Sequence, residues 1–252
     1  MLPEIQLGPL TLQSFGLMLG IGFVACGVFA TRHLKELGRP ADWAYEMVFA
    51  ALIGGIVGAR LWAVVENWDD ASEDLLGSLF SGAGLVFYGG ALGGALTVAA
   101  WAKWRGVLDA NSFDIAAVPL AAGYAIGRIG CQLAGDGDYG EAWDGPWAMA
   151  YPDGTVPTTE EVHPTPVYET LAMGAVTWWL WRHRHSFPSG TLFALWAVLS
   201  GVERLLVEFV RRNDAVAAGL TLPQLISLAL IAGGAGWLLR ARARGGVPAP
   251  VV

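Results

Sequence analysis

The chain has 252 residues, of which 54% are hydrophobic and only 15% are charged, and its formal net charge is -7. A soluble domain has about 25% charged residues, so this deficit excludes a disordered chain and indicates an integral membrane protein. The lack of a basic excess excludes nucleic-acid binding. Its two cysteines cannot build a disulfide scaffold. No Cys/His cluster has metal-ligand spacing, so neither a metal nor another cofactor is expected.

Seven stretches of the sequence are long and apolar enough to cross a bilayer, which takes about 20 residues per helix. They are residues 11–30, 44–65, 83–101, 113–133, 164–182, 190–210 and 221–240. We therefore expect an all-α integral membrane protein with seven transmembrane helices, formed as a single domain over residues 1–252. The segment 134–163 is expected as a loop insertion on the outer side.

The distribution of lysine and arginine predicts the orientation of these helices. Ten of the 15 cations fall in alternate connections and in the C-terminal tail, which the positive-inside rule assigns to the cytoplasm. The opposite connections carry clusters of Asp and Glu. Glu4 precedes the first span and the first basic residue, Arg32, follows it, so this span is an anchor and not a cleaved signal peptide. The pattern predicts a multi-pass protein with its N-terminus outside and its C-terminus inside.

Five arginines have no place in this topological pattern: Arg60, Arg128, Arg204, Arg211 and Arg212. The first three lie inside apolar spans, where one Arg costs roughly 2.5–3.5 kcal/mol on insertion scales. Arg204, Glu208 and Arg211 follow i, i+4, i+7 spacing and therefore share one helix face. One interpretation is a structural ion pair or a side chain that extends to the interface. The other is an outward-facing polar cavity that binds an anionic lipid head group.

Two polar runs flank these arginines on the expected outer side. Residues 127–140 are rich in glycine at the end of the fourth span, so their backbone is expected to line a cavity rather than lipid. Residues 163–169 open the fifth span with prolines that suit a first helical turn. Of the four histidines, only His163 is expected on the outer side. It is either a cap or packing residue, or a group that transfers a proton.

These segments together resemble a known family, the bacterial phosphatidylglycerol–prolipoprotein diacylglyceryl transferases. Order, spacing and topology agree over nearly the whole chain, in residues 15–18, 58–61, 87–90, 127–140, 163–169 and 203–211. The resemblance implies a transferase of the bacterial cytoplasmic (inner) membrane. Its substrates would be phosphatidylglycerol and the signal-peptide lipobox of prolipoproteins. It would also contact other membrane lipids. We expect the protein to be a monomer, and we expect no nucleic-acid partner.

The resemblance also implies roles for individual residues of this sequence. Arg128 and Arg204 correspond to the family's phosphate-binding arginines, and Asp136 corresponds to its acidic signature residue. His163, Tyr88 and Asp136 are the candidates, in that order, for the base that accepts the thiol proton. The catalytic set is therefore Arg128, Arg204, His163, Tyr88 and Asp136. The expected substrate-binding set is Arg60, Glu208, Arg211, Tyr168, Glu169, Gly89, Gly90 and Gly140.

Two members of the substrate-binding set are acidic and need a separate explanation. Glu208 is expected to hold Arg204 or Arg211 in place, and Glu169 to do the same for another cation. A purely structural role is the alternative for both carboxylates. Either role requires an ion pair, because a buried charge is costly unless it is paired.

The chain departs from the family pattern at several positions. Tyr88 stands where the family commonly has His, Cys131 and Ala134 stand where it has Asn, and the segment 136–140 is one residue longer. These departures allow a second reading, a diverged relative that binds an anionic phospholipid without catalysis or serves another acceptor. Cys131, one turn after Arg128, is a candidate nucleophile, against the simpler role of a small packing residue.

Other membrane functions lack their sequence features. The only lysines, Lys35 and Lys103, lie in expected cytoplasmic connections, so the seventh span has no residue for a retinal Schiff base. The sequence contains neither a Gly-x-Ser-x-Gly nor a His-Glu-x-x-His motif, which argues against an intramembrane protease. The hydropathy pattern has no matched halves of the kind found in secondary transporters.

Overall fold

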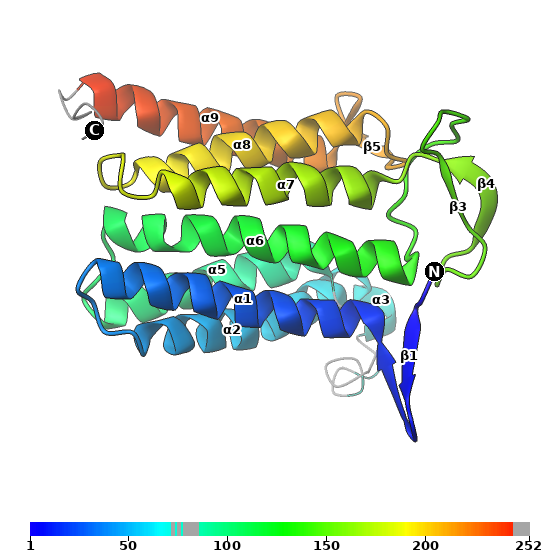
Figure 1. Cartoon of the computed structure of the whole chain (residues 1–252), viewed down its shortest axis with the longest axis horizontal. Coiled ribbons are helices and arrows are strands. Elements are labelled where there is room, and N and C mark those ends of the chain that lie inside the picture. The colour runs from blue at the N-terminus through cyan, green and yellow to red at the C-terminus, as the bar shows by residue number, and fades with distance from the viewer. Residues whose placement is uncertain (72–73, 75–76, 78–85, 244–252) are drawn as a thin grey trace. The chain divides into compact units, whose positions relative to one another are not determined.

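The computed structural model describes residues 1–71, 74, 77 and 86–243, and this part of the chain is mostly helical (Figure 1). Seven of the described helices have 18 to 25 residues, and a short helix, α3 (Trp68–Ala71), follows the second of them. The seven are α1 (Ser14–Glu36), α2 (Trp43–Glu66), α5 (Phe87–Trp104), α6 (Ala110–Ala134), α7 (Thr165–Arg182), α8 (Thr191–Glu208) and α9 (Leu222–Ala243). Each overlaps one predicted apolar stretch, although residues 83–85 of the third stretch lie outside the described residues.

Three of the described helices are long and apolar enough to cross a membrane by length and composition. These are α1, α2 and α9. Helix α8 contains three charged residues, Glu203, Arg204 and Glu208. The mostly helical architecture and these apolar helices are consistent with the predicted class of membrane protein.

The described residues also form three short antiparallel hairpins, which the expectation of an all-helical chain did not include. They pair β1 (Glu4–Leu7) with β2 (Leu10–Gln13), β3 (Met149–Tyr151) with β4 (Thr158–Val162), and β5 (Ala215–Ala217) with β6 (Leu220–Thr221). Strand β2 takes residues 11–13 from the first predicted span, so α1 begins only at Ser14. The fully buried Ser14 anchors this junction, since its backbone N–H donates to the carbonyl oxygen of Pro3 at 2.8 Å.

The chain forms two compact units. Unit 1 comprises Met1–Ala30 and Phe113–Val252, and unit 2 comprises Thr31–Ser112. Unit 2 is built on α2 and α5, which contact each other through glycines. A Cβ atom on Gly58 would lie 2.3 Å from the carbonyl oxygen of Gly89. Small residues of this kind let membrane helices approach at the backbone.

We expect Gly58→Ala to destabilise the α2–α5 contact by about 1–3 kcal/mol, because the new methyl group overpacks it. Gly55→Ala, one turn earlier in α2, is the matched control. A Cβ there would lie 3.6 Å from the carbonyl oxygen of Gly90, an ordinary contact, and alanine favours helix over glycine. Thermal unfolding of the two purified variants in detergent measures the difference. Equal unfolding temperatures would contradict the prediction.

Unit 1 holds α6, α7 and α8 around a buried core. Helix α9 packs on α8, and the first part of α1 contacts α6. The core contains Ala117, Val118, Ala121, Met173, Leu180 and Leu192. A Cβ atom on Gly201 of α8 would lie 2.8 Å from the carbonyl oxygen of Ser227 in α9, so these two helices also meet at the backbone. Asp114 of α6 caps the start of α8, since its carboxylate accepts from the backbone N–H groups of Gly190 at 2.6 Å and Phe193 at 2.8 Å.

The connectivity of unit 1 brings two loops together at one end. Helices α6 and α8 end there, and α7 and α9 begin there (Figure 1). Gly140 in the loop after α6 forms a β-bridge with Arg211 in the loop after α8. We call this the loop end of unit 1. It places the signature run after α6 beside the arginines at the end of α8.

Candidate functional site

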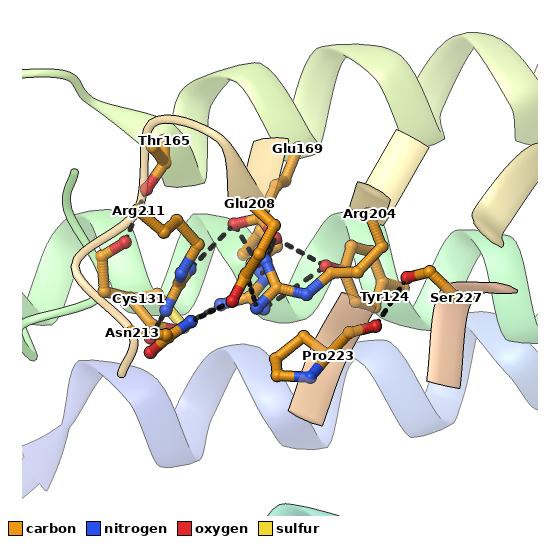
Figure 2. A network of polar contacts seen from close by, with 12 residues as sticks. Tyr124, Cys131, Thr165, Glu169, Arg204, Glu208, Arg211, Asn213, Pro223 and Ser227 are labelled. Atoms are coloured by element: carbon orange, nitrogen blue, oxygen red, sulfur yellow. Dashed lines mark hydrogen bonds and ion pairs between the residues drawn. The ribbon is translucent and has the colours of Figure 1, made fainter. Parts of the chain in front are cut away.

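Glu169 lies at the centre of a buried ion-pair cluster at the loop end of unit 1 (Figure 2). Its side chain is 0% exposed, and its carboxylate contacts three arginines. The distances are 3.1 Å to Nε of Arg128, 3.1 Å to Nη1 of Arg204 and 3.4 Å to Nη1 of Arg211. The hydroxyl of Tyr124 donates to the same carboxylate at 2.6 Å. We call Arg128, Arg204, Arg211 and the carboxylates that pair with them the arginine cluster.

Local helix geometry explains why these side chains converge. Tyr124 and Arg128 are one turn apart on α6, and Arg128 Nη2 donates to the Tyr124 hydroxyl at 3.2 Å. Glu169 lies in the second turn of α7, and Pro166 lies in the first turn. Arg204 ends up near the C-terminus of α8. Three helices and one loop thus each supply a charged group to a site whose carboxylate is excluded from water.

Glu208 is the second fully buried carboxylate of the cluster, with a side chain 0% exposed. Its Oε2 pairs with Nη2 of Arg204 at 2.9 Å, the i, i+4 contact that the sequence spacing predicts. Its Oε1 accepts from Asn213 at 2.8 Å and from the Thr221 hydroxyl at 2.6 Å. Glu208 therefore ties the loop after α8 and the start of α9 to Arg204.

Asp138 is the third carboxylate of the cluster and the most exposed, at 31% of its side chain. Its two oxygens pair separately with Arg128 and Arg211. The Thr165 hydroxyl donates to the Asp138 carbonyl oxygen at 2.5 Å. Burial opposes ionisation of this carboxyl, but the charges of Arg128 and Arg211 outweigh it and lower the pKa of Asp138 to about 2. Asp138 thus carries a negative charge at physiological pH.

Asp136 was the acidic residue that the resemblance selected, and it occupies a different environment. It makes no ion pair with an arginine in the part of the chain that the structure describes. Its Oδ1 accepts from the backbone N–H of Asp138 at 3.3 Å. Burial, and after it the charge of Asp138, raises the pKa of Asp136 above its ordinary value. Asp136 is therefore the carboxyl beside the cluster that accepts a proton more readily.

Cys131, Asp136 and Asp138 place a thiol sulfur and two carboxylate oxygens within 4.8 Å of one another. Arg128 and Arg211 already neutralise Asp138, so this group is less suited to a metal ion than its spacing suggests. The buried thiol of Cys131 lies 3.7 Å from Nη1 of Arg128. Its role as a nucleophile stays a prediction.

His163 lies in an aromatic group rather than in the arginine cluster. Its ring stacks on Trp143 with centroids 4.4 Å apart and planes inclined by 10°. Its Nδ1 is 3.3 Å from the hydroxyl of Tyr168, which also accepts from Nε1 of Trp147 at 2.7 Å. Two predicted site residues, His163 and Tyr168, are therefore in contact in the structure. Stacking explains the position of His163, and its role as a base stays a prediction.

Gly140 links the aromatic group to the cluster through the backbone. Its N–H donates to the carbonyl oxygen of His163 at 2.8 Å, and the residue bridges to Arg211. A Cβ atom here would lie 2.2 Å from the carbonyl oxygen of Val210. Only glycine fits this approach, so Gly140 positions Arg211, in addition to any contact it makes with substrate.

The four predicted site residues Arg60, Tyr88, Gly89 and Gly90 lie in unit 2. Gly89 is buried, and a Cβ there would lie 2.3 Å from Cβ of Trp62, which gives this glycine a packing function. The ring of Tyr88 lies 5.8 Å from that of Phe87. Arg60 is half-buried in α2. Their substrate-binding and catalytic roles stay predictions.

Sequence reasoning missed several members of the cluster, although some left a signal. Tyr124 precedes Arg128 by one turn and was detectable by that spacing. Asp136 and Asp138 both lie within the family signature of residues 127–140, but the resemblance selected Asp136. Asn213 and Thr221 reach Glu208 through loop structure, which no local pattern reveals. Arg212, the fifth unexplained arginine, lies outside the cluster and faces the exposed Glu160 at 3.4 Å.

Acidification should destabilise the wild-type protein more than an Asp138→Asn variant. The folded-state pKa of Asp138 is about 2, and an Asp in an unfolded chain has a pKa of about 3.9. The stability from this carboxylate is therefore present above about pH 4 and is lost as the pH falls through about 2. Thermal unfolding of both proteins in detergent, across this range, measures the difference. A parallel decline in the two proteins would contradict the low pKa.

Comparison with known proteins identifies the family of the chain. A family model described as prolipoprotein diacylglyceryl transferase matches residues 4–240. A phosphatidylglycerol–prolipoprotein diacylglyceryl transferase of Methylococcus capsulatus is 33% identical over 254 residues, covering 95% of each chain. Proteins of the same name from Leptospira interrogans and Clostridium tetani are 31% and 30% identical, over 86% and 88% of this chain and 76% and 90% of their own. The chain therefore belongs to the prolipoprotein diacylglyceryl transferase family, as its sequence motifs predict.

Proposed function

We propose that this protein transfers the diacylglyceryl group of phosphatidylglycerol to the lipobox cysteine thiol of prolipoproteins. Family membership supports the reaction class, and the names of the relatives supply the two substrates. The observation that carries the proposal is the convergence of three arginines on one buried carboxylate. Guanidinium groups bind phosphate oxygens well, because their planar fork donates two parallel hydrogen bonds.

The chemistry requires stabilisation of a departing phosphate. The thiol sulfur attacks a saturated carbon of the lipid glycerol, a C–S bond forms, and the C–O bond to the phosphate breaks. The thiol loses its proton to a base, and glycerol phosphate leaves. Negative charge accumulates on the phosphate, and preorganised cations in a water-poor site stabilise it. One such contact is typically worth about 3–4 kcal/mol of the barrier.

Arg128 and Arg204 are the proposed phosphate-stabilising cations, and Glu169 and Glu208 hold them in position. The ion-pair distances support this arrangement, since Arg204 lies between both carboxylates at 3.1 and 2.9 Å. Thiol activation is a smaller task, because a free Cys has a pKa of about 8.5. His163, Tyr88 and Asp136 remain the candidate bases. The raised pKa of Asp136 and its position beside the cluster favour it more than sequence reasoning did.

The proposed setting is the bacterial inner membrane, with seven spans, the N-terminus outside and the C-terminus inside. Three apolar helices and the family support a membrane location. The lysine and arginine distribution supports the orientation, which puts the loop end of unit 1 on the outer side. A pocket of about 150 Å³ between α6 and α7 suits part of an acyl chain; it is lined by Ile129, Gln132, Val167, Thr170 and Leu171. We propose one transferase domain that acts as a monomer.

A direct test combines the purified protein, phosphatidylglycerol vesicles and a lipobox peptide. Mass spectrometry should detect a peptide that carries one diacylglyceryl group, and a peptide with Ser in place of the acceptor Cys should remain unmodified. Binding of phosphatidylglycerol without transfer would favour the second reading, a diverged lipid-binding relative. Tyr88 and Cys131, which depart from the family pattern, are the features that support that reading.

The same spectra test the nucleophile role of Cys131. After incubation with lipid alone, a diacylglyceryl adduct on the intact protein would support a covalent intermediate. An unmodified protein that nevertheless transfers the group to the peptide would exclude it. Full transfer by Cys131→Ala would exclude it independently.

A further inference from the structure

The carboxylates of the arginine cluster are not equivalent. Glu169 and Glu208 are completely buried, whereas 31% of the Asp138 side chain is exposed. The two buried carboxylates lie on helices, and Asp138 lies on the loop that follows α6. A ligand that approaches the cluster from solvent therefore reaches Asp138 before it reaches the other two.

Asp138 contacts the arginines in the manner of a bound phosphate. One carboxylate oxygen pairs with Arg128 and the other pairs with Arg211. A phosphodiester also presents two anionic oxygens on one central atom and carries one negative charge, and guanidinium groups bind both kinds of anion in the same geometry. The side chain of Asp138 thus satisfies the donors that a phosphate would use.

The third arginine is less available to a ligand. Arg204 uses Nη1 for Glu169 at 3.1 Å and Nη2 for Glu208 at 2.9 Å, and both partners are excluded from solvent. Separating it from either would leave a buried carboxylate with one fewer cation, which is costly. Arg128 and Arg211 also contact Glu169, so each would still have a carboxylate partner without Asp138.

We propose that the donor phosphate binds between Arg128 and Arg211, in the position that the Asp138 carboxylate occupies here, and that Asp138 is a counter-ion exchanged for the lipid. This inference rests on the proposed function and refines it. Arg204 then lies behind the phosphate, where Glu169 and Glu208 hold it in position, and its charge stabilises the phosphate without direct contact.

Charge balance supports the exchange. The cluster pairs three arginines with three carboxylates, so it has no net charge in this structure. A phosphodiester with one negative charge that replaces one aspartate preserves this balance. The product is a phosphate monoester with up to two negative charges, and the return of Asp138 to the arginines would favour its release.

The backbone around Asp138 has a defined conformation. Gly135 and Gly137 adopt positive φ angles of 59° and 91°, so the backbone on either side of Asp136 uses conformations that favour glycine. The backbone at Asp138 is held by the Thr165 hydroxyl at 2.5 Å. In the proposed exchange the backbone stays in place, and the Asp138 side chain alone rotates away from the two arginines.

The exchange is tested with Asp138→Asn, and Glu160→Gln, at a 68% exposed carboxylate outside the cluster, serves as the matched control. Binding of phosphatidylglycerol in nanodiscs and of free glycerol phosphate is measured for each protein, together with KM and kcat. Asp138→Asn should bind both ligands roughly three- to tenfold more tightly, because an ion pair that competes with them is lost. Its kcat should fall if product release becomes slower, and Asp138→Glu should restore wild-type affinity.

Arg211→Ala completes the test, since it removes one of the two proposed phosphate ligands. It should weaken binding of both ligands, while Arg212→Ala, at the exposed neighbouring position, should not. Unchanged or weaker binding by folded Asp138→Asn would overturn the exchange, as would affinity in Arg211→Ala equal to wild type. Wild-type protein that binds phosphatidylglycerol but does not transfer it would contradict the proposed function alone. Absence of binding by wild type would overturn both.

Discussion

Replacing Glu169 by alanine is expected to cost about 3–5 kcal/mol of folding free energy, because it leaves buried charges without their partner. Three arginines meet this one carboxylate, at 3.1, 3.1 and 3.4 Å. Their mutual repulsion would then act in a site that excludes water, and the geometry needed for phosphate binding would be lost. Thermal unfolding and the transfer assay should therefore both report a severe defect.

Two further variants separate charge from packing at Glu169. Glu169→Gln keeps the shape and an acceptor for the Tyr124 hydroxyl, but it removes the negative charge. It should be destabilised nearly as much as the alanine variant if the ion pairs dominate. Glu160→Ala breaks an ion pair of a 68% exposed side chain with Arg212, and should change stability by less than about 1 kcal/mol. A Glu169→Ala protein as stable as Glu160→Ala would refute the central role of Glu169.

Arg128→Ala should lower kcat/KM for phosphatidylglycerol by at least about 10²–10³-fold. Arg128 contacts both the fully buried Glu169 and the partly exposed Asp138, so it lies between the interior of the cluster and its more exposed side. Loss of its guanidinium removes a charge that stabilises the departing phosphate. Transfer to a lipobox peptide, followed by mass spectrometry over time, gives the rate.

Arg212→Ala is the matched control for Arg128→Ala. Arg212 is 40% exposed, pairs with Glu160 at 3.4 Å and lies outside the cluster, so its loss should leave the rate near wild type. Arg128→Lys should recover only part of the activity, because lysine keeps the charge but cannot form the planar two-bond contact. Unfolding temperatures are compared in parallel. Wild-type rates in Arg128→Ala would exclude the phosphate role of this residue.

The sequence by itself determined the helical class of the protein and most of the polar cluster. Arg128, Arg204 and Arg211 were identified because each is a cation without a place in the positive-inside pattern. Glu208 was paired with Arg204 because residues four apart on a helix lie on one face, and the structure confirms this contact at 2.9 Å. Such inferences succeed because hydropathy, charge distribution and helical spacing are properties of local sequence.

Loop conformation was beyond the reach of these local patterns. The family resemblance selected Asp136 as the acidic signature residue, but Asp138 is the one that pairs with Arg128 and Arg211. Which of the two aspartates reaches the arginines depends on the path of the loop. This path is set by two glycines with positive φ and by the bridge between Gly140 and Arg211. Likewise, stacking of His163 on Trp143 brings together residues from separate parts of a loop insertion.

The tertiary structure also decided which groups surround Glu169. Tyr124, Arg128, Arg204 and Arg211 come from two helices and a loop that are up to 87 residues apart along the chain, between positions 124 and 211. The sequence placed a carboxylate and several arginines in apolar segments, where each alone would be unfavourable. Only the packing of α6, α7 and α8 determines that they neutralise one another, because a buried charge needs its partner in contact, and contact is set by the fold.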